Sequence, residues 1–478
     1  MRMIKREQMQ FGQVRIEDIR FNLKSRDDIP KILMGLQYIY TKKELREEIF
    51  GILRETMPEG VSMRTGRPGM ELWKVLVMGV LKVSLGWDLD RLLEMLNNHK
   101  TIRLMLGHGM MDEDYQYNYQ TVKDNIELLN PEVINKINDI VVREGHKIVK
   151  KDGKIRGRCD SFVLKTNVHF PTDLNLYWDS LRKVIKLSYK ASRGIDGNGW
   201  RKWKHHMRRV KRCYRKSQQA VKGKKKPEEK TAACMEYLEV GVEIITKAKN
   251  TLPVIKNRQG YREKAEEIEK YIRYSEIFME QIERRLIKGE KIAHGEKIFS
   301  VFKPYTEWIQ KGKAGVVAEL GVRIGILDDQ YGFHLSYRVM HKKTDDKIAV
   351  EITEEAKAKY PELHSCSYDK AFYTPENLRK LKEIIPFVVM PKKGRRNSEE
   401  EAEEKSPGFI RERLGRSAVE SDIHSLMVHG LSVCRDYGKE RFHRYVALGI
   451  LGDDLHKLGA VLKEKKYRRY GKKKKRVA

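Results

Sequence analysis

Cysteines and long hydrophobic runs are scarce in this sequence of 478 residues. The five cysteines are Cys159, Cys213, Cys234, Cys366 and Cys434. They are odd in number, widely scattered and without a CxxC pair or zinc-ligand spacing, which argues against a disulfide framework and fits a reducing cytosol. The start of the chain lacks the apolar core of a signal peptide, and the most hydrophobic run, Leu72 to Leu85, is interrupted by Lys74 and Lys82. We therefore expect a cytoplasmic protein that does not cross a membrane.

Basic residues outnumber acidic ones and give the chain a large positive charge. Against 98 Lys and Arg stand 67 Asp and Glu, a formal net charge of +31, while 40% hydrophobic and 9% aromatic residues exclude a wholly disordered chain. Residues 181–230 hold 19 basic and 3 acidic residues, and residues 461–478 hold 10 basic and one acidic residue. Such clustering predicts a polyanionic partner, with nucleic acid favoured over acidic lipid. For the last ten residues, a solvated basic tail is an equal alternative.

Within the first basic segment, aromatic residues alternate with the charges, as in surfaces that bind a phosphate backbone. The aromatic residues are Trp200, Trp203 and Tyr214. The candidates for phosphate contacts are Arg201, Lys202, Lys204, Arg208, Arg209, Lys211 and Arg212. We therefore expect this segment to lie along DNA.

The length suggests about three domains. Apolar spacing predicts helices over residues 38–142, in which 72–83 and 89–96 flank a short turn; this pair supports a bundle and permits, without requiring, DNA reading. A strand is predicted over 154–167, helices over 175–295, and then strands that alternate with helices, which indicates a mixed α/β sheet. The expected organisation is a helical N-terminal domain (1–145), an α/β domain (150–174 and 299–460) interrupted by a helical insertion (175–298), and a basic tail (461–478).

Finer predictions concern the second half of the chain. Residues 318–327 and 333–340 should form a hairpin around a turn at Asp328-Asp329, and 364–369 a strand that ends at Asp369. Helices are expected over 347–359, 375–384, 411–431 and 442–462, with an exposed loop at 399–404. Residues 432–460 are expected to be structural.

Three acidic residues lie among weakly polar or apolar neighbours: Asp160 on the first strand, Asp369 at the end of another strand, and Glu420 within a helix. Each alone is most simply an ion-pair or capping partner. Together, carboxylates from a central strand, a neighbouring strand end and a facing helix are what a pair of Mg²⁺ ions requires. Phosphodiester chemistry on a polyanion would also agree with the charge of the chain.

Several linked motifs resemble a known family. They are Cys159-Asp160-Ser-Phe-Val-Leu-Lys-Thr-Asn-Val-His-Phe-Pro-Thr-Asp173, Phe302-Lys-Pro-Tyr-Thr-Glu-Trp-Ile309 with Lys311-Gly-Lys313, Tyr368-Asp369-Lys-Ala-Phe-Tyr373, and Arg416-Ser-Ala-Val-Glu420-Ser-Asp-Ile-His424. With Gly66-Arg-Pro68 and Tyr119-Gln-Thr-Val-Lys-Asp-Asn125, they resemble bacterial insertion-sequence transposases with an RNase H-like DDE domain, within the group catalogued as not classified yet. The resemblance covers most of residues 60–460.

The resemblance implies a DNA transposase with a catalytic and metal-binding triad of Asp160, Asp369 and Glu420. Two Mg²⁺ ions, replaceable by Mn²⁺, would support cleavage and strand transfer at the inverted repeats of a transposon. The partner would be double-stranded DNA, and a dimer or larger assembly of the protein would bring its two ends together. Arg416 and His424 share a helix face with Glu420 and could contact phosphate. Related families place Tyr and Lys where this chain has Arg413 and Met427, which leaves a hairpin-forming route open.

Other candidates carry a simpler alternative. Asp173 could support the triad as a neighbouring carboxylate, or cap a helix over 174–183. Trp308, with Lys311 and Lys313, could hold a displaced nucleotide, or belong to the core. Asp345-Asp346 is most simply a helix cap. Two other functions remain alternatives: a catalytically silent DNA-binding protein derived from a transposase, and a nuclease of the same fold that cuts without joining.

Overall fold

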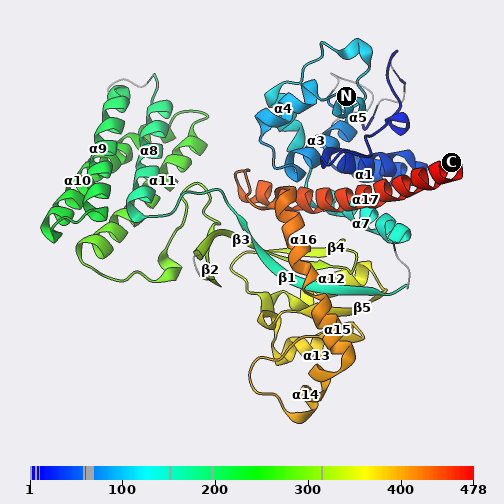
Figure 1. Ribbon diagram of the computed structural model, residues 1–478. Coiled ribbons are helices and arrows are strands. Elements are labelled where there is room, and N and C mark those ends of the chain that lie inside the picture. The colour runs from blue at the N-terminus through cyan, green and yellow to red at the C-terminus, as the bar shows by residue number, and fades with distance from the viewer. Residues whose placement is uncertain are drawn as a thin grey trace. The chain divides into compact units, whose positions relative to one another are not determined.

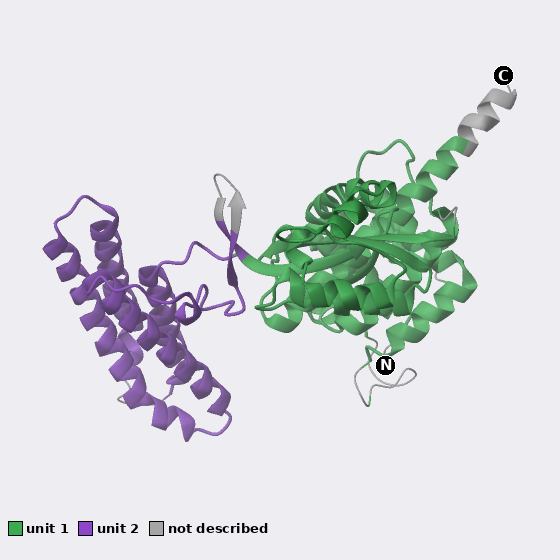
Figure 2. Cartoon of the chain, turned by 90° about the horizontal axis from the view of Figure 1, so that it is seen from below, with its two compact units in different colours: residues 1–167, 321–478 green, residues 168–320 purple. Residues whose placement is uncertain are grey.

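The computed structural model describes residues 3–5, 8–9, 11–57, 60, 69–149, 153–194, 199–313 and 316–477, and the chain divides into two compact units (Figure 2). Unit 1 comprises residues 1–167 and 321–478, and unit 2 residues 168–320. The Gly66-Arg-Pro68 segment lies outside the described residues, as do the side chains of Lys311 and Lys313. Unit 2 contains the predicted insertion and extends beyond both of its predicted ends.

Unit 1 joins the N-terminal helices to the sheet through its last long helix. The N-terminal helices are α1 (Ile29–Thr41), α2 (Lys43–Arg54), α3 (Leu72–Ser84), α4 (Leu89–Asn98), α5 (Lys100–Met105), α6 (Tyr119–Ile126) and α7 (Pro131–Val149). Helix α17 (Lys439–Val477) packs against α1, α3 and α7 (Figure 1). Gly452 and Gly459 allow this close approach, since a Cβ there would collide with Ser84 and with the Lys31 carbonyl. The expected N-terminal domain is therefore not a separate unit.

The predicted helix pair near residue 85 is present, and Asp88 caps α4 by accepting a hydrogen bond from the Arg91 amide (2.8 Å). Every residue of α3 except Lys74 is buried. Helix α3 is therefore a core helix of a bundle, and its side chains are not free to read DNA. Within the described residues, no helix combines the length and the hydrophobicity that crossing a membrane requires.

The predicted mixed sheet is present. Its strands are β1 (Ile155–Lys165), β2 (Glu307–Lys313), β3 (Val316–Asp328), β4 (His334–Met340), β5 (Leu363–Tyr368) and β6 (Phe387–Val389). The order is β2-β3-β1-β5-β6, and β4 also pairs with β3. Strand β1 is antiparallel to β3 and parallel to β5, so it lies in the middle of the sheet. Helices α12 (Ala349–Lys359) and α13 (Pro375–Ile384) follow β4 and β5, close to their predicted bounds.

Two local predictions after the sheet are wrong. The predicted loop at 399–404 is helix α14 (Ser398–Lys405), because Asn397 and Glu400 form a capping box that starts it. The single helix predicted over 411–431 is three segments: α15 (Pro407–Gly415), α16 (Ala418–Leu426) and the short π-helical turn η8 (Met427–Leu431). The helix breaks at Gly430, which has a φ of 97° and whose Cβ would collide with the Val83 carbonyl.

Unit 2 is largely a helical bundle. Its helices are α8 (Asp173–Ala191), α9 (Trp203–Lys222), α10 (Pro227–Lys256) and α11 (Arg262–Ile282), and a short 3-10 turn, η3 (Trp200–Lys202), leads into α9. Tyr177, Trp200 and Tyr237 are fully buried in its core. The residue that caps α8 is Thr172, which accepts from the Asn175 amide, so the capping role predicted for Asp173 is wrong. Thr172 precedes the first helical turn, and Asp173 already belongs to that turn.

Candidate metal and nucleic-acid site

Strand β1 presents two charged side chains to helix α16, which lies alongside it (Figure 1). Arg158 and Asp160 are two residues apart and therefore point to the same face of the sheet. The Arg416 guanidinium, just before α16, donates to Asp160 Oδ2 (2.9 Å), and Arg158 lies 3.5 Å from Asp422 on α16. Two ion pairs thus hold the helix that carries Glu420 against the central strand.

Asp369 comes directly after β5, and this strand is the parallel neighbour of β1. Parallel strands end at the same edge of a sheet, which brings Asp369 towards Asp160. Arg416 lies between them, with Nη2 3.7 Å from Asp369 Oδ1 while Nη1 contacts Asp160. The structure therefore brings together two of the three predicted carboxylates around one cation.

Burial and the neighbouring charges shift the pKa of Asp160. Burial raises this pKa above its ordinary value, and the negative charges of Asp369 and Asp345 raise it further. The Ser161 amide, which donates to Asp160 Oδ1 (2.7 Å), and Arg416 oppose the shift. The negative charge of Asp160 is therefore disfavoured by its surroundings, and a nearby cation such as Arg416 stabilises it.

Asp345 is an acidic neighbour that the sequence interpretation missed. It begins the 3-10 turn η6 (Asp345–Lys347) after β4, and helix α12 starts later, at Ala349, without a side-chain cap. The predicted capping role of Asp345 and Asp346 is therefore wrong. Asp345 Oδ2 lies 3.9 Å from Arg323, whereas Oδ1 is buried and accepts no hydrogen bond from the part of the chain that the structure describes. An acidic pair in the loop between β4 and α12 was the available signal.

Glu420 lies apart from this pair of carboxylates. The buried face of α16 is marked by Val419 and Leu426, and Glu420 and His424 are exposed. Among the described residues, the groups of His, Cys, Asp and Glu with ligand atoms within 4.8 Å of one another lie elsewhere, so the predicted triad does not form a closed cluster. The role of Glu420 as the third metal ligand therefore stays a prediction.

Two further candidates belong to unit 2. Asp173 is buried and pairs with Arg285 (3.2 Å), and burial raises its pKa. Trp308, in β2, packs its ring against Phe170 and Phe299, with ring centroids 5.5 and 5.9 Å away. These residues line a cavity of 370 Å³ in unit 2. Trp308 is half-buried, so the alternative that it belongs wholly to the core does not hold.

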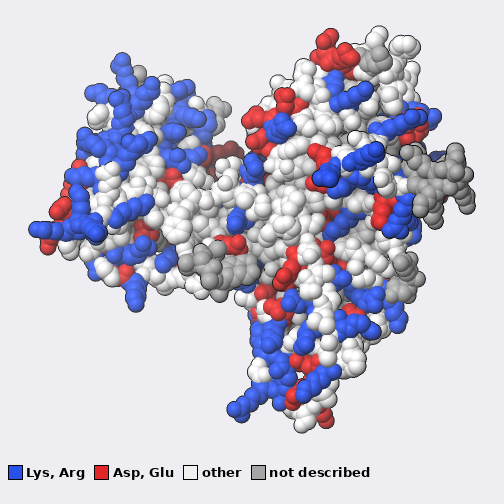
Figure 3. Space-filling view, viewed as in Figure 1, with Lys and Arg blue, Asp and Glu red and all other residues white. Residues whose placement is uncertain are grey.

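The basic segment of unit 2 forms an exposed surface. Figure 3 shows Lys and Arg gathered over α9 and α10. Arg209 is held by Glu243 on α10, its Nη2 donating to Glu243 Oε1 (2.9 Å), whereas six other predicted phosphate contacts are exposed. They are Arg201, Lys202, Lys204, Arg208, Lys211 and Arg212.

The aromatic residues of this segment face the protein instead. Trp200 is fully buried and its indole donates to Thr251 Oγ1 (3.0 Å), while Trp203 and Tyr214 stack on Tyr189 and Trp178. The aromatic side chains of this segment thus pack inside unit 2, and its basic side chains lie on the surface.

No family model, curated protein or solved structure matches this chain.

Proposed function

We propose that the protein is a DNA transposase of a bacterial insertion sequence, which cleaves phosphodiester bonds at the ends of the element and joins them to target DNA. One observation carries the proposal: carboxylates from the central strand and from the end of its parallel neighbour converge on a single cation beneath the helix that carries Glu420. The mixed sheet interrupted by a helical unit also supports the RNase H-like fold that the sequence motifs imply.

The residues around Asp160 suit Mg²⁺. Carboxylate oxygens are its preferred ligands, and the buried Asp345 Oδ1, which lacks a hydrogen-bond donor among the described residues, is an oxygen that a cation would satisfy. Asp160, Asp369 and Glu420 would hold two ions, with Asp345 beside them. Bound there, the ions supply Lewis-acid activation of the attacking hydroxyl and stabilisation of the departing 3′-oxygen.

The chain's own side chains then have three tasks. Arg416 holds Asp160 and Asp369 together before the ions bind, and afterwards its guanidinium is free to contact a DNA phosphate beside them, with His424 further along α16. The exposed cations of α9 attract flanking DNA through the phosphate backbone. Trp308 offers a partly exposed ring face for stacking a displaced nucleotide. A cytoplasmic dimer or larger assembly would bring two ends together.

Cleavage of labelled element ends in Mg²⁺ tests the catalytic part of this proposal. Asp369→Asn should abolish cleavage, while gel-shift affinity for the ends at fixed salt is unchanged. Glu383→Gln removes an exposed carboxylate of α13, 64% exposed, and should leave both activities intact. Full cleavage by Asp369→Asn would refute the assigned site.

A catalytically silent DNA-binding protein is the second candidate, and the exposure of Glu420 is the observation that favours it. In that case Arg416 would be a permanent partner of Asp160, and wild-type protein would bind the ends without Mg²⁺-dependent cleavage. Supplying pre-cut ends separates a transposase, which joins them to target DNA, from a nuclease, which only cuts.

A further inference from the structure

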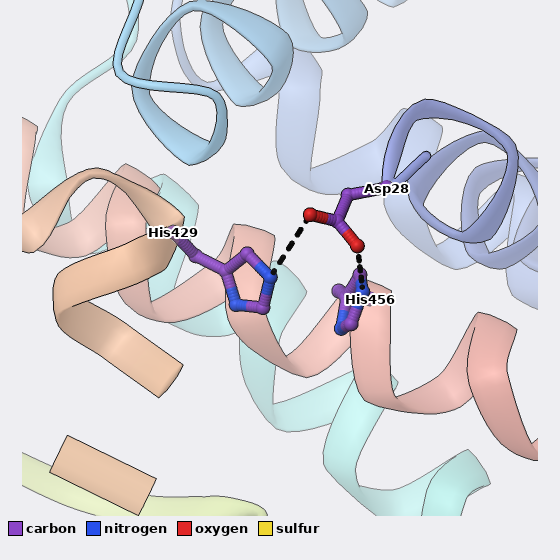
Figure 4. Close-up of side chains that lie close together, drawn as sticks. All are labelled: Asp28, His429 and His456. Atoms are coloured by element: carbon purple, nitrogen blue, oxygen red, sulfur yellow. Dashed lines mark hydrogen bonds and ion pairs between the residues drawn. The ribbon is translucent and has the colours of Figure 1, made fainter. Parts of the chain in front are cut away.

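A second cluster of metal-ligand types lies in unit 1, outside the predicted triad. Asp28 precedes α1, His429 lies in η8, and His456 lies in α17, and Figure 4 shows both imidazole rings directed at the Asp28 carboxylate. His456 Nε2 is 3.0 Å from Asp28 Oδ1, and His429 Nε2 is 4.0 Å from Asp28 Oδ2. The ligand atoms of all three residues lie within 4.8 Å of one another.

The tautomer of His429 is set by a buried carboxylate behind it. Its Nδ1 donates to Asp453 Oδ1, which also accepts from Ser425 Oγ (2.7 Å). Burial opposes the charge of Asp453, but Lys457 and the hydrogen bonds from His334 and His429 hold its pKa well below the ordinary value, so it is an acceptor. Because Nδ1 faces Asp453, the other ring nitrogen of His429, Nε2, is the one on the side of Asp28, 4.0 Å from Asp28 Oδ2.

His456 is also suited to ligation. Its Nε2 faces the Asp28 carboxylate at 3.0 Å, so this nitrogen is in position to bind the same ion. The two imidazole centroids are 4.1 Å apart, and the side chains of His429 and His456 are only 6% and 13% exposed. Asp28, 33% exposed, also accepts from Lys31 Nζ (2.9 Å), as carboxylates that bind metals commonly accept a second hydrogen bond.

The other histidine cluster of unit 1 has a different chemistry. His334 engages carboxylates through both ring nitrogens, Asp328 through Nδ1 and Asp453 through Nε2 (2.8 Å). Lys457 Nζ lies 2.7 Å from the same Asp453. Protein cations already balance these buried acids and His334 has no lone pair to offer, so this group is an internal ion network.

We propose that Asp28, His429 and His456 bind one transition-metal ion of the Zn²⁺ type, with Asp453 as the carboxylate that orients His429. Zn²⁺ bonds of about 2.0–2.2 Å to nitrogen and oxygen place neighbouring ligand atoms roughly 3–3.5 Å apart, which small side-chain movements reach from the observed 3.0 and 4.0 Å. Three protein ligands leave a fourth position open.

Such an ion would help to hold α16, the helix that carries Glu420, in position. It would tie the start of α1 and the middle of α17 to η8, the turn that directly follows α16. The site does not depend on the proposed function, since it shares no residue with Asp160, Asp369 or Glu420.

Zn²⁺ binding by the full-length chain tests the inference. We expect one equivalent by elemental analysis, and Co²⁺ absorption of four-coordinate intensity after substitution. His456→Gln should lose the bound ion, and Asp453→Asn should weaken binding roughly 10–100-fold. His443→Gln is the matched control, because His443 pairs with His341 (Nε2 to Nε2, 3.2 Å) away from the cluster, and it should bind as wild type does.

The double variant Asp160→Asn/Asp369→Asn separates this site from the Mg²⁺ site, and it should keep the Zn²⁺ equivalent whether or not DNA cleavage is ever observed. Circular dichroism establishes that each variant is folded; should His456→Gln not fold, Asp28→Asn serves in its place. Absence of micromolar Zn²⁺ binding by wild type, undiminished binding by the folded ligand variant, or preference for Mg²⁺ over Zn²⁺ would each overturn the proposal.

Discussion

Replacing Arg416 with Gln removes the cation between Asp160 and Asp369 while keeping most of the side-chain length. The Arg416 and Asp160 side chains are only 24% and 22% exposed, so their contact is worth about as much as a hydrogen bond to a charged group, ~1.5–3 kcal/mol. Asp369 is 49% exposed and adds little. We expect Arg416→Gln to lower the free energy of unfolding by about 2 kcal/mol and to raise the pKa of Asp160 further, since Arg416 opposes that shift.

A double-mutant cycle with Asp160→Asn isolates the contact. A neutral amide in place of the Asp160 carboxylate would not need the guanidinium, so Arg416→Gln should cost much less in that background, with a coupling of roughly 1–3 kcal/mol. Urea unfolding, read by hydrogen exchange of peptides from β1, reports unit 1 separately from unit 2. If the carboxylates form a Mg²⁺ site, excess Mg²⁺ should stabilise Arg416→Gln more than wild type. Additive effects within about 0.3–0.5 kcal/mol would refute the bridging role.

Four further predictions follow from other parts of the chain. Gly430→Ala should cost about 3 kcal/mol or more in urea unfolding, because its φ of 97° and the Val83 carbonyl both exclude a Cβ. Trp200→Phe should destabilise unit 2 by about 1–3 kcal/mol, by loss of the bond to Thr251 and of packing, without changing DNA affinity measured by gel shift. Replacing Arg201, Lys204, Arg208 and Lys211 with Ala should weaken DNA binding and flatten its dependence on salt, and an unchanged slope would remove α9 from the interface. Burial, opposed by His334 and Lys457, raises the pKa of Asp454 to about 7. The native state therefore retains a proton that the unfolded state releases near pH 4, so stability should fall as pH rises from about 4 to 7. Asp454→Asn should flatten that fall in unfolding curves recorded across this range.

Strands and helices with a clear apolar period could be predicted from the sequence. The pattern around Asp160 places it on a strand, and the strand predicted over 364–369 places Asp369 at a strand end, as the structure has them. Strand β1 is central because it pairs with both β3 and β5. The local pattern around β1 does not indicate this position, which depends on the strands that follow it in the chain.

The buried ion network could not be predicted from local patterns. The sequence predicts a turn at Asp328-Asp329, but Asp328 ends β3 and both residues are fully buried, with partners on β4 and α7. His334 and Asp453 are 119 residues apart, and the sequence around each indicates only its own secondary structure. Trp200 likewise is followed in the sequence by Arg201, Lys202 and Lys204, yet it is buried in the core of unit 2.

The position of Glu420 follows from the way α16 is held. Arg416 is fixed to Asp160 before the helix begins, Asp422 is held by Arg158, and His429 is anchored to Asp453 after it ends. Rotating α16 to bury Glu420 would expose Val419 and Leu426 and break these pairs, which a single carboxylate cannot offset. We therefore expect any approach of Glu420 to Asp160 and Asp369 to come from movement of its side chain, with α16 staying in place.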